Sequence, residues 1–295
     1  MQFLGPAIGF GLVTASILAL AAVGFTMQFG VTNILNLAYG EVMAASGFVA
    51  LMVNRAGYSI WIGMAVSAVF GALFSYLLNR AVFIPFVRRG TRLFGMVIVT
   101  IAVGLIIENA ILATTGPNFF SYSMDQESSY NVGPLILSTS QIVIMGIALV
   151  CMLAIHGVLR YTKLGMAMRA TATDASLARG CGIRTERIVD VAWLISGAMC
   201  GLAGVALFIN TTSFTAPTAN SFLVVIVAAA VLGGVGQPYG AMLGALVIGL
   251  TSEIAATFFN PSYKNVVAFV ILVAVLLLRP QGILAEIAAQ KEVVA

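Results

Sequence analysis

Long apolar runs separated by short polar segments dominate the chain. A helix needs about 20 apolar residues to cross a bilayer. On this basis the pattern predicts spans at 6–29, 60–83, 94–115, 135–159, 191–209, 241–259 and 266–278, with half-spans at 41–53 and 222–232. The predicted fold is all-α, a polytopic transmembrane helix bundle of about eight or nine membrane segments, two of them broken or re-entrant. Residues 1–295 are therefore expected to form a single transmembrane domain.

The first polar interruption of this pattern is the segment 30–47, GVTNILNLAYGEVMAASG. Unpaired backbone groups are costly in hydrocarbon, so a break here must be satisfied by protein or by water. We predict that Asn33, Asn36 and Tyr39 line a path. Glu41 has two possible roles, since its carboxylate can cap the positive end of the half-helix 41–53 or contact a solute directly.

A second interruption follows the half-span 222–232, in the sequence LGGVGQPYGAMLGALVIG. Tyr239-Gly240 precedes an apolar run here, as Tyr39-Gly40 does in the first interruption. Paired segments broken by Gly or Pro in the two halves of a chain are typical of a transport site in repeat-built transporters. Gln237 and Tyr239 therefore join the pathway candidates, while an internal repeat stays an open alternative.

The composition indicates a membrane environment, and the distribution of charge predicts the orientation of the chain in the membrane. The chain is 61% hydrophobic and 8% charged, against about 25% charged in soluble domains. Twelve of its fourteen basic residues gather in 80–92, in 160–187 and at Arg279 and Lys291, and the positive-inside rule assigns these regions and the C-terminus to the cytoplasm. The loops 116–134 and 210–221 should face outward. The side of the N-terminus depends on whether 30–53 crosses once or re-enters.

This charge distribution also limits the partners. The net charge of +4 reflects the topological bias, so the lipid bilayer is an expected partner and nucleic acid is not. The first 40 residues carry no charge, and no cleaved signal peptide is expected.

Small and polar residues inside the spans predict packing and charge burial. The small residues of 6–29 and the series Gly197, Gly201 and Gly204 are typical of close helix packing. Glu108 and Glu253 lie inside spans, and such carboxylates should face the bundle or a water-filled space.

The loop 160–190 predicts a short helix that docks to a cytoplasmic partner. Thr171 or Thr173 can begin the helix, Asp174 is favourable near its positive end, and Gly180 and Gly182 can end it. A solvated connector is the alternative. The residues expected to carry the docking are Arg169, Thr171, Asp174, Leu177, Arg179 and Gly182.

Several kinds of chemistry are not expected. A phosphate-binding loop needs Gly-Lys-Ser/Thr, but Lys163, Lys264 and Lys291 follow Thr, Tyr and Gln. Cys151, Cys181 and Cys200 lack metal-ligand spacing and are expected to be free thiols. We therefore expect no cofactor, no metal site and no catalysis by this chain alone.

Four stretches stand out together and in this order: TNILNLAYGEVMAASGFVA, YTKLGMAMRATATDASLARGCGI, AAAVLGGVGQPYGAMLGALVIGLTSE and LRPQGIL. Through them the chain resembles the H-type permease subunit of branched-chain amino-acid ABC importers, and the match runs nearly from end to end. The opening motif of that family usually carries His where this chain has Tyr39, a departure that bears on the identity of the solute.

The resemblance implies a type II importer-like permease in a bacterial inner membrane, working by alternating access. Its implied partners are a second permease (an M-type relative or a second copy), two cytoplasmic ATP-binding subunits and an extracytoplasmic solute-binding protein. Residues 171–182 then resemble the coupling helix that seats in an ATPase groove.

The solute and the transport class keep alternatives. Branched-chain or other apolar amino acids are the first expectation, and relatives of this group that carry urea, short amides or aromatic acids are similar. A stand-alone secondary transporter or channel would also use broken helices and membrane carboxylates such as Glu41, Glu108 and Glu253. A membrane-embedded enzyme is a weaker third class.

Overall fold

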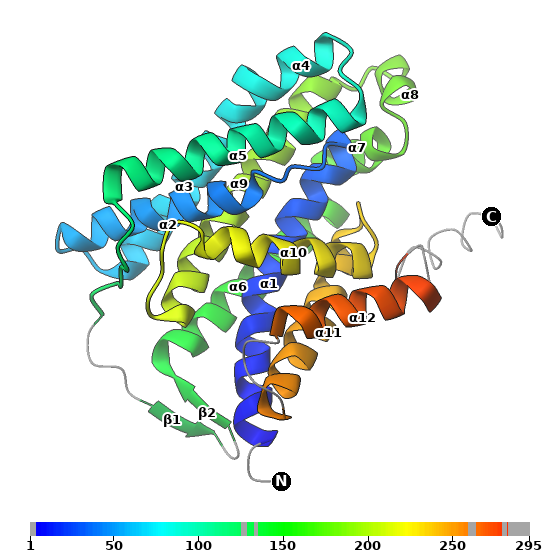
Figure 1. Cartoon of the computed structure of the whole chain (residues 1–295). Coiled ribbons are helices and arrows are strands. Elements are labelled where there is room, and N and C mark those ends of the chain that lie inside the picture. The colour runs from blue at the N-terminus through cyan, green and yellow to red at the C-terminus, as the bar shows by residue number, and fades with distance from the viewer. Residues whose placement is uncertain (1–3, 125–128, 133–134, 259–263, 279–281, 283–295) are drawn as a thin grey trace. The chain divides into compact units, whose positions relative to one another are not determined.

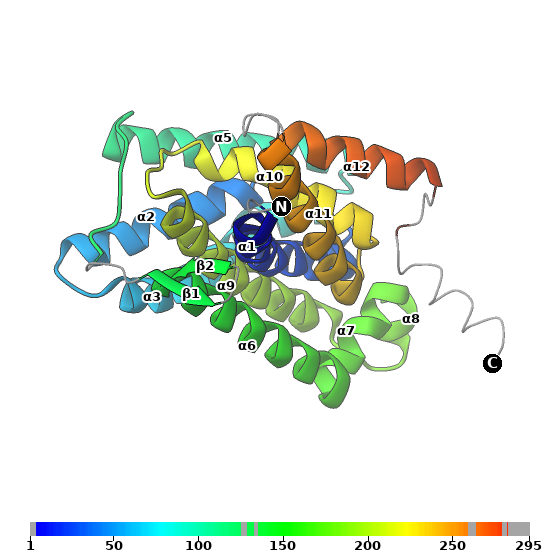
Figure 2. The same ribbon diagram turned by 90° about the horizontal axis from the view of Figure 1, so that it is seen from below.

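The computed structural model describes residues 4–124, 129–132, 135–258, 264–278 and Gly282, and these residues are almost entirely helical (Figure 1; Figure 2). The elements are α1 (Leu4–Thr32), α2 (Tyr39–Arg55), α3 (Ile60–Leu78), a π-helical turn η1 (Asn79–Phe83), α4 (Ile84–Arg88), α5 (Leu93–Thr115), β1 (Ser129–Val132), β2 (Leu135–Ser138), α6 (Thr139–Tyr161), α7 (Lys163–Thr173), α8 (Ala175–Gly180), α9 (Thr185–Thr211), α10 (Thr218–Gly233), α11 (Pro238–Phe258) and α12 (Lys264–Leu278).

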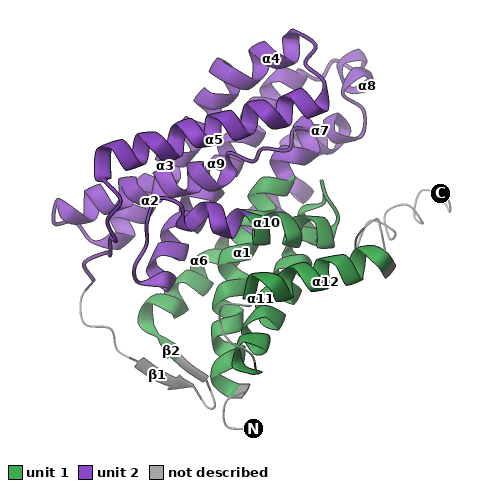
Figure 3. Ribbon diagram, in the orientation of Figure 1, with its two compact units in different colours: residues 1–26, 125–150, 224–295 green, residues 27–124, 151–223 purple. Residues whose placement is uncertain are grey.

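The helices form two compact units, coloured separately in Figure 3. Unit 1 comprises residues 1–26, 125–150 and 224–295, and unit 2 comprises residues 27–124 and 151–223. Each unit is described by itself below.

Six helices in the described ranges are long and apolar enough to cross a membrane. They are Gly5–Thr32, Ile60–Arg88, Leu93–Thr115, Thr139–Tyr161, Thr185–Thr211 and Pro238–Phe258. This confirms the polytopic helical fold. The helices α10 and α12 are apolar but shorter, so a count beyond six and the re-entrant geometry stay predictions.

A small β-hairpin is the departure from the all-α expectation. The strands β1 and β2 pair antiparallel, with Ser129 opposite Ser138 and Val132 opposite Leu135. The predicted span 135–159 is therefore wrong at its start, since α6 begins at Thr139. Apolar character alone does not distinguish a short strand from a helical turn, and here the pairing with β1 selects the strand.

Unit 2 is built around the close contact of α3 and α9, which confirms the small-residue packing predicted for 191–209. A Cβ atom added to Gly197 would collide with the carbonyl of Gly71, and one added to Gly201 would collide with the carbonyl of Ser67. The Ser67 hydroxyl donates to the carbonyls of Ser46 on α2 and Gly201 on α9, at 2.8 and 3.1 Å. Three helices are thereby held at backbone-contact distance.

Glycines also allow close helix contacts at two places in unit 1. A Cβ atom added to Gly11 on α1 would lie 3.1 Å from the Leu250 side chain. On α11, Gly249 packs on the backbone of Ala15. Gly233 and Gly240 meet where α10 turns into α11. The small residues of the first span therefore serve helix packing, as predicted.

The two ends of α9 carry different loops in unit 2. At its start, Asp190 pairs with Arg80 at 2.5 Å and Glu186 pairs with Arg88 at 3.3 Å. At its other end, about 40 Å away along the 27-residue helix, Phe214 bridges to Phe120. The predicted cytoplasmic segments 80–92 and 160–187 thus meet at the start of α9 through Arg88 and Glu186, and the predicted outer loops 116–134 and 210–221 meet beyond its other end through Phe120 and Phe214. Asp125, Glu127, Arg279 and Lys291 lie outside the described residues.

Candidate functional site

The chain breaks its first long helix where the sequence predicted. Helix α1 ends at Thr32 and α2 begins at Tyr39, and the intervening residues 33–38 are not helical. Asn33 is exposed and has a φ of 54°, a left-handed conformation that Asn adopts more easily than most residues. The Asn36 side-chain oxygen accepts a hydrogen bond from the Ala38 N–H at 3.2 Å. This local bond ends the extended segment and starts α2.

Tyr39 anchors the start of α2 against α9. Its side chain is fully buried, and its hydroxyl donates to the Ser196 carbonyl at 3.4 Å. The Cys200 thiol, one helical turn further along α9, donates to the Tyr39 carbonyl at 3.4 Å. The Ser196 hydroxyl in turn donates to the side-chain oxygen of Gln28, near the end of α1, at 3.1 Å. The break is therefore fixed on one face of α9.

Glu41 occupies the first turn of α2, where the helix dipole favours a negative charge. It is 5% exposed and lies beneath Gly104 of α5, whose hypothetical Cβ would be 3.3 Å from the carboxylate. Glu41 interacts electrostatically with Glu108, which lies on α5 as Gly104 does. Its Oε2 atom has no hydrogen-bond partner in the described part of the chain. The position is compatible with both predicted roles, a helix cap and a solute contact.

Three further buried polar atoms near this break have no described hydrogen-bond partner: Gln28 Nε2, Asn36 Nδ2 and Trp193 Nε1. The Trp193 ring stacks on Phe83 with centroids 5.1 Å apart and packs with Ile34 from the break. The sequence prediction missed Gln28, Trp193 and Ser196. A usable signal was the amide of Gln28 shortly before the break, since a polar residue inside an apolar span is costly.

An apolar groove of about 520 Å³ lies beside this cluster in unit 2. Ala45, one turn after Glu41, and Val103 and Ile107, which flank Gly104, are among its lining residues. The complete lining is Ala45, Phe74, Leu78, Val82, Val103, Ile106, Ile107, Ala110, Ile111 and Thr114. The groove is thus almost purely hydrocarbon up to the level of the carboxylate.

The second break joins α10 to α11 in unit 1. Gly234 and Gly236 have φ angles of 105° and 88°, which only glycine adopts without strain. The Gln237 carbonyl accepts the Ala241 N–H at 3.0 Å and starts α11, and the Tyr239 side chain is 41% exposed. The helix interruption is confirmed. Gln237 and Tyr239 belong to a different unit from the first four pathway candidates, so their predicted shared path stays a prediction.

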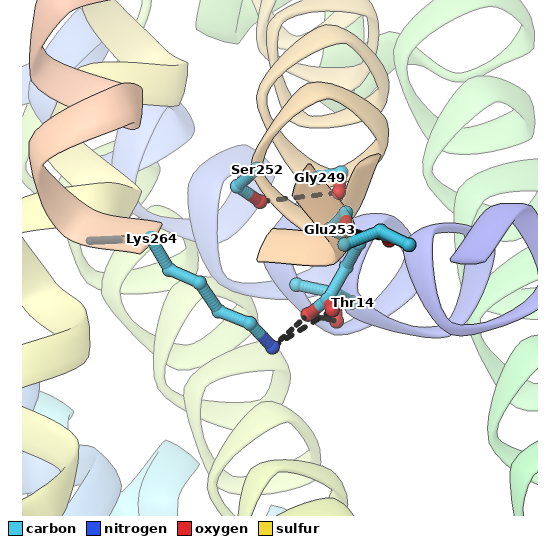
Figure 4. A network of polar contacts seen from close by, with 6 residues as sticks. Thr14, Gly249, Ser252, Glu253 and Lys264 are labelled. Carbon is cyan, nitrogen blue, oxygen red and sulfur yellow. Dashed lines mark hydrogen bonds and ion pairs between the residues drawn. The ribbon is translucent and has the colours of Figure 1, made fainter. Parts of the chain in front are cut away.

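Glu253 of α11 is the best-satisfied membrane carboxylate of unit 1 (Figure 4). Its Oε1 accepts from the Thr14 hydroxyl at 3.0 Å, and the Lys264 ammonium lies 2.8 and 2.7 Å from its two oxygens. Its side chain is 13% exposed and that of Lys264 is 40% exposed. The contacts fasten α1, α11 and the first residue of α12 together. Each carboxylate oxygen therefore has a hydrogen-bond partner.

The loop 160–190 contains two helices in place of the single predicted one. Helix α7 is capped by the Thr162 side chain and runs through Thr171 and Thr173. The expectation that either threonine starts a helix is therefore wrong, because their hydroxyls donate backward to Ala167 and Arg169 inside α7. Such backward bonds remove the side chain from any capping role.

Helix α8 begins after Asp174, whose carboxylate accepts from the backbone N–H groups of Ser176 and Leu177 at 2.8 and 3.0 Å. The Ser176 hydroxyl bond is the largest of several contacts that lower the pKa of Asp174 below its usual value. Gly182, with φ of 85°, follows the end of the helix. The predicted roles of Asp174 and Gly182 at the two helix ends are confirmed.

The α7–α8 pair presents a mixed basic and apolar surface. Arg169 and Arg179 are exposed, and the Leu177 side chain is 67% exposed, whereas Thr171 is only 3% exposed. Thr171 therefore supports α7 from within, while Leu177 of α8 and Met166 of α7 are exposed apolar side chains of the pair.

Sequence comparison gives this geometry a context. Residues 7–276 match the family described as branched-chain amino acid transport system, permease component. The chain is 31% identical to the high-affinity branched-chain amino acid transport permease LivH of Salmonella typhimurium, over 95% of each chain. It is also 31% identical to the corresponding permease BraD of Pseudomonas aeruginosa, again over 95% of each chain.

The fold is similar to that of a solved structure described as an inward-facing conformation of a putative metal-chelate type ABC transporter. The TM-score is 0.50 with 15% identity, covering 91% of this chain and 85% of the other. At this identity the likeness concerns the fold alone.

Proposed function

Because the chain belongs to the family of permease components of branched-chain amino acid transport systems, we propose that it imports branched-chain or other apolar amino acids. It is the transmembrane permease of an ABC importer. We place the translocation path along the break 33–38 and the start of α2. ATP hydrolysis takes place in separate subunits, and the family comparison favours this assembly over the stand-alone transporter considered above.

The observation that carries the proposal is the buried polar break against α9. Residues 33–38 interrupt a helix at a depth where unpaired polar groups are expensive. Asn36, Tyr39 and Glu41 are all 5% exposed or less. Irregular backbone at membrane depth is tolerated where it is buried in protein or lines a cavity. A solute path is the functional reason for keeping such polar groups there.

The α7–α8 pair is proposed to couple this path to ATP hydrolysis. A short helix with Leu177 exposed between Arg169 and Arg179 offers an apolar contact with basic flanks. The Asp174 cap fixes where that helix starts. Movement of an ATP-binding subunit would then reach the membrane through α9, which follows α8 after a short turn.

The proposed partners are two cytoplasmic ATP-binding subunits, a second permease chain and an extracytoplasmic solute-binding protein. The side assignment follows the basic segments gathered at the start of α9. The C-terminus is proposed to lie on that same cytoplasmic side.

ATP-driven uptake of L-leucine into proteoliposomes tests this function. The assembled importer carrying Asp174→Arg or Arg169→Glu should lose ATP-dependent uptake, because the first variant removes the α8 cap and the second reverses a flanking charge. Arg160→Glu, the same charge change outside α7–α8, serves as the control. Normal uptake by both α7–α8 variants, at equal membrane levels, would refute the coupling assignment.

A further inference from the structure

Unit 2 holds three buried hydrogen-bond donors that no described group accepts. They are Gln28 Nε2, Asn36 Nδ2 and Trp193 Nε1, on side chains that are 1%, 1% and 0% exposed. A buried donor without an acceptor loses its hydration and gains nothing in return. The fold therefore retains an unfavourable arrangement that a bound acceptor would relieve.

The three donors gather around one turn of α9. Gln28 reaches α9 through the bond from the Ser196 hydroxyl at 3.1 Å. Trp193 lies three residues before Ser196 on the same helix and packs on Ile34 of the break, two residues before Asn36. Residues three apart share a helix face, so Trp193 and Ser196 lie on one face of α9, which side chains of α1 and of the break contact.

A buried acceptor of opposite character lies one turn further along. Glu41 Oε2 has no described donor, and Glu41 interacts electrostatically with Cys200, four residues after Ser196. Four residues advance a helix by about 6 Å. The Ser196 contact of Gln28 and the Cys200 interaction of Glu41 are thus about 6 Å apart along α9, a separation that a small molecule can span.

We propose that these groups form a binding site for an α-amino-acid zwitterion, with its carboxylate at Gln28, Asn36 and Trp193 and its ammonium at Glu41. This inference rests on the proposed transport function and names the groups that would contact the solute. A carboxylate accepts about four hydrogen bonds and so uses all three donors. A urea or amide carbonyl accepts about two, and an aromatic acid has no cation for Glu41.

The site is closed in this structure, because its four side chains are 0–5% exposed. A solute reaches it only when the break 33–38 separates from α9. That separation breaks the 3.4 Å bonds from the Tyr39 hydroxyl to Ser196 and from the Cys200 thiol to Tyr39. The bound zwitterion would then replace two weak contacts, a long O–H···O bond and a bond from a thiol, which is a weak donor.

Uptake by the assembled importer in proteoliposomes, with L-leucine as the probe, tests the carboxylate half. Gln28→Glu keeps the oxygen that accepts from Ser196 but turns a donor toward the solute carboxylate into a negative charge. Trp193→Phe keeps an aromatic ring against Phe83 and removes the indole N–H together with one of the two fused rings. Leucine uptake should fall about tenfold in the first and several-fold in the second, at equal membrane levels.

Trp61→Phe is the matched control, since it makes the same change at the other tryptophan of the chain. It should leave uptake unchanged. Wild-type uptake rates in both Gln28→Glu and Trp193→Phe would overturn the site. An importer that takes up no leucine with ATP even as wild type would contradict the proposed function instead, and the binding assay below then decides the site by itself.

That assay uses the full chain in lipid nanodiscs with Trp61→Phe, which leaves Trp193 as its sole tryptophan. Leucine should change the Trp193 emission in a saturable way. 4-Methylpentanoate, which lacks the ammonium, and isoamylamine, which lacks the carboxylate, should fail to do so at the same concentrations. An equal response to urea or benzoate, or no response to leucine, would overturn the zwitterion assignment.

Discussion

Glu253 and Lys264 form an ion pair within unit 1. Both carboxylate oxygens of Glu253 lie within 2.8 Å of the Lys264 ammonium, and the Thr14 hydroxyl adds a third contact. Removing one member leaves the other charge partly buried without its partner, which is worse than removing both.

A double-mutant cycle with Lys264→Met and Glu253→Gln should therefore show strong coupling. Because Lys264 is 40% exposed, each single change should cost about 1–3 kcal/mol, below the range for fully buried pairs. Thermal unfolding of the purified chain in detergent measures it. The exposed pair Arg88–Glu186, at 68% and 76% exposure, is the control and should couple by less than about 1 kcal/mol. Equal coupling in both pairs would contradict the structural role of Glu253.

Asp174 is expected to make the stability of α8 depend on pH. Its pKa is lowered from the usual 3.8 by the hydrogen bonds it accepts in the cap of α8. A group with a lowered folded-state pKa stabilises the fold above its unfolded pKa and loses that effect as the pH falls through the folded pKa. The cap is thus fully present at neutral pH.

Amide hydrogen exchange should detect this in α8. Protection of Leu177 and Ala178, corrected for intrinsic exchange, should be constant from neutral pH down to about 5 and fall below about 4. Asp174→Asn, whose side-chain oxygen still caps but does not titrate, should remove the acid dependence. A pH-independent protection in the wild-type chain would show that the carboxylate charge does not matter to this helix.

Whole helices are positioned by glycine contacts, and α3 with α9 is the clearest example. A single methyl at Gly201 meets the backbone of Ser67, which no rotamer change can move aside.

Gly201→Ala should therefore push the two helices apart and destabilise the chain by about 1–3 kcal/mol, the usual range for overpacking. The midpoint of thermal unfolding in detergent is the measurement. Gly157→Ala on α6 is the matched control, because nothing lies within 4 Å of its hypothetical Cβ; it should be neutral or slightly stabilising. If both variants unfold at the wild-type midpoint, the close approach of α3 and α9 is not rigid.

The helices and strands also show which features the sequence alone predicts and which it does not. The series Gly197, Gly201 and Gly204 could be predicted to lie at a close helix contact, because small residues three or four positions apart are typical of such contacts. The start of α8 was misjudged, because Thr171 and Thr173 look like caps but bond backward. The hairpin of β1 and β2 was missed, because its strands are four residues long and depend on each other.

At the scale of the whole molecule, the sequence predicted the membrane fold and the position of both breaks. It did not single out Gln28 and Trp193, since the bond that brings Gln28 to Ser196 joins residues 168 positions apart. Local pattern carries no information about such a contact. Likewise, the partner of Glu253 is visible only once α11 and α12 are folded side by side.

The assembled importer should cover the face of α5 that this chain leaves exposed. Asn109 lies in the middle of that helix, and its amide donates only to the Leu105 carbonyl of its own helix, at 2.7 Å. A polar side chain is costly against lipid, so we expect the second permease chain to contact it.

Cysteine cross-linking in native membranes checks this expectation. Asn109→Cys should form a cross-link to the second permease, whereas Leu149→Cys on α6, 62% exposed and surrounded by apolar residues, should not. Cross-linking at position 149 alone would assign the contact to a different face.

The π-helical turn η1 has a consequence for the history of the chain. A π turn amounts to one residue inserted into an α-helix, and removing it rotates everything downstream by about 100°. Deleting a residue within Asn79–Phe83 would swing Arg88 away from Glu186. Relatives with a one-residue gap at this place in an alignment should therefore carry a different ion pair at the start of α9, and the two changes should be inherited together.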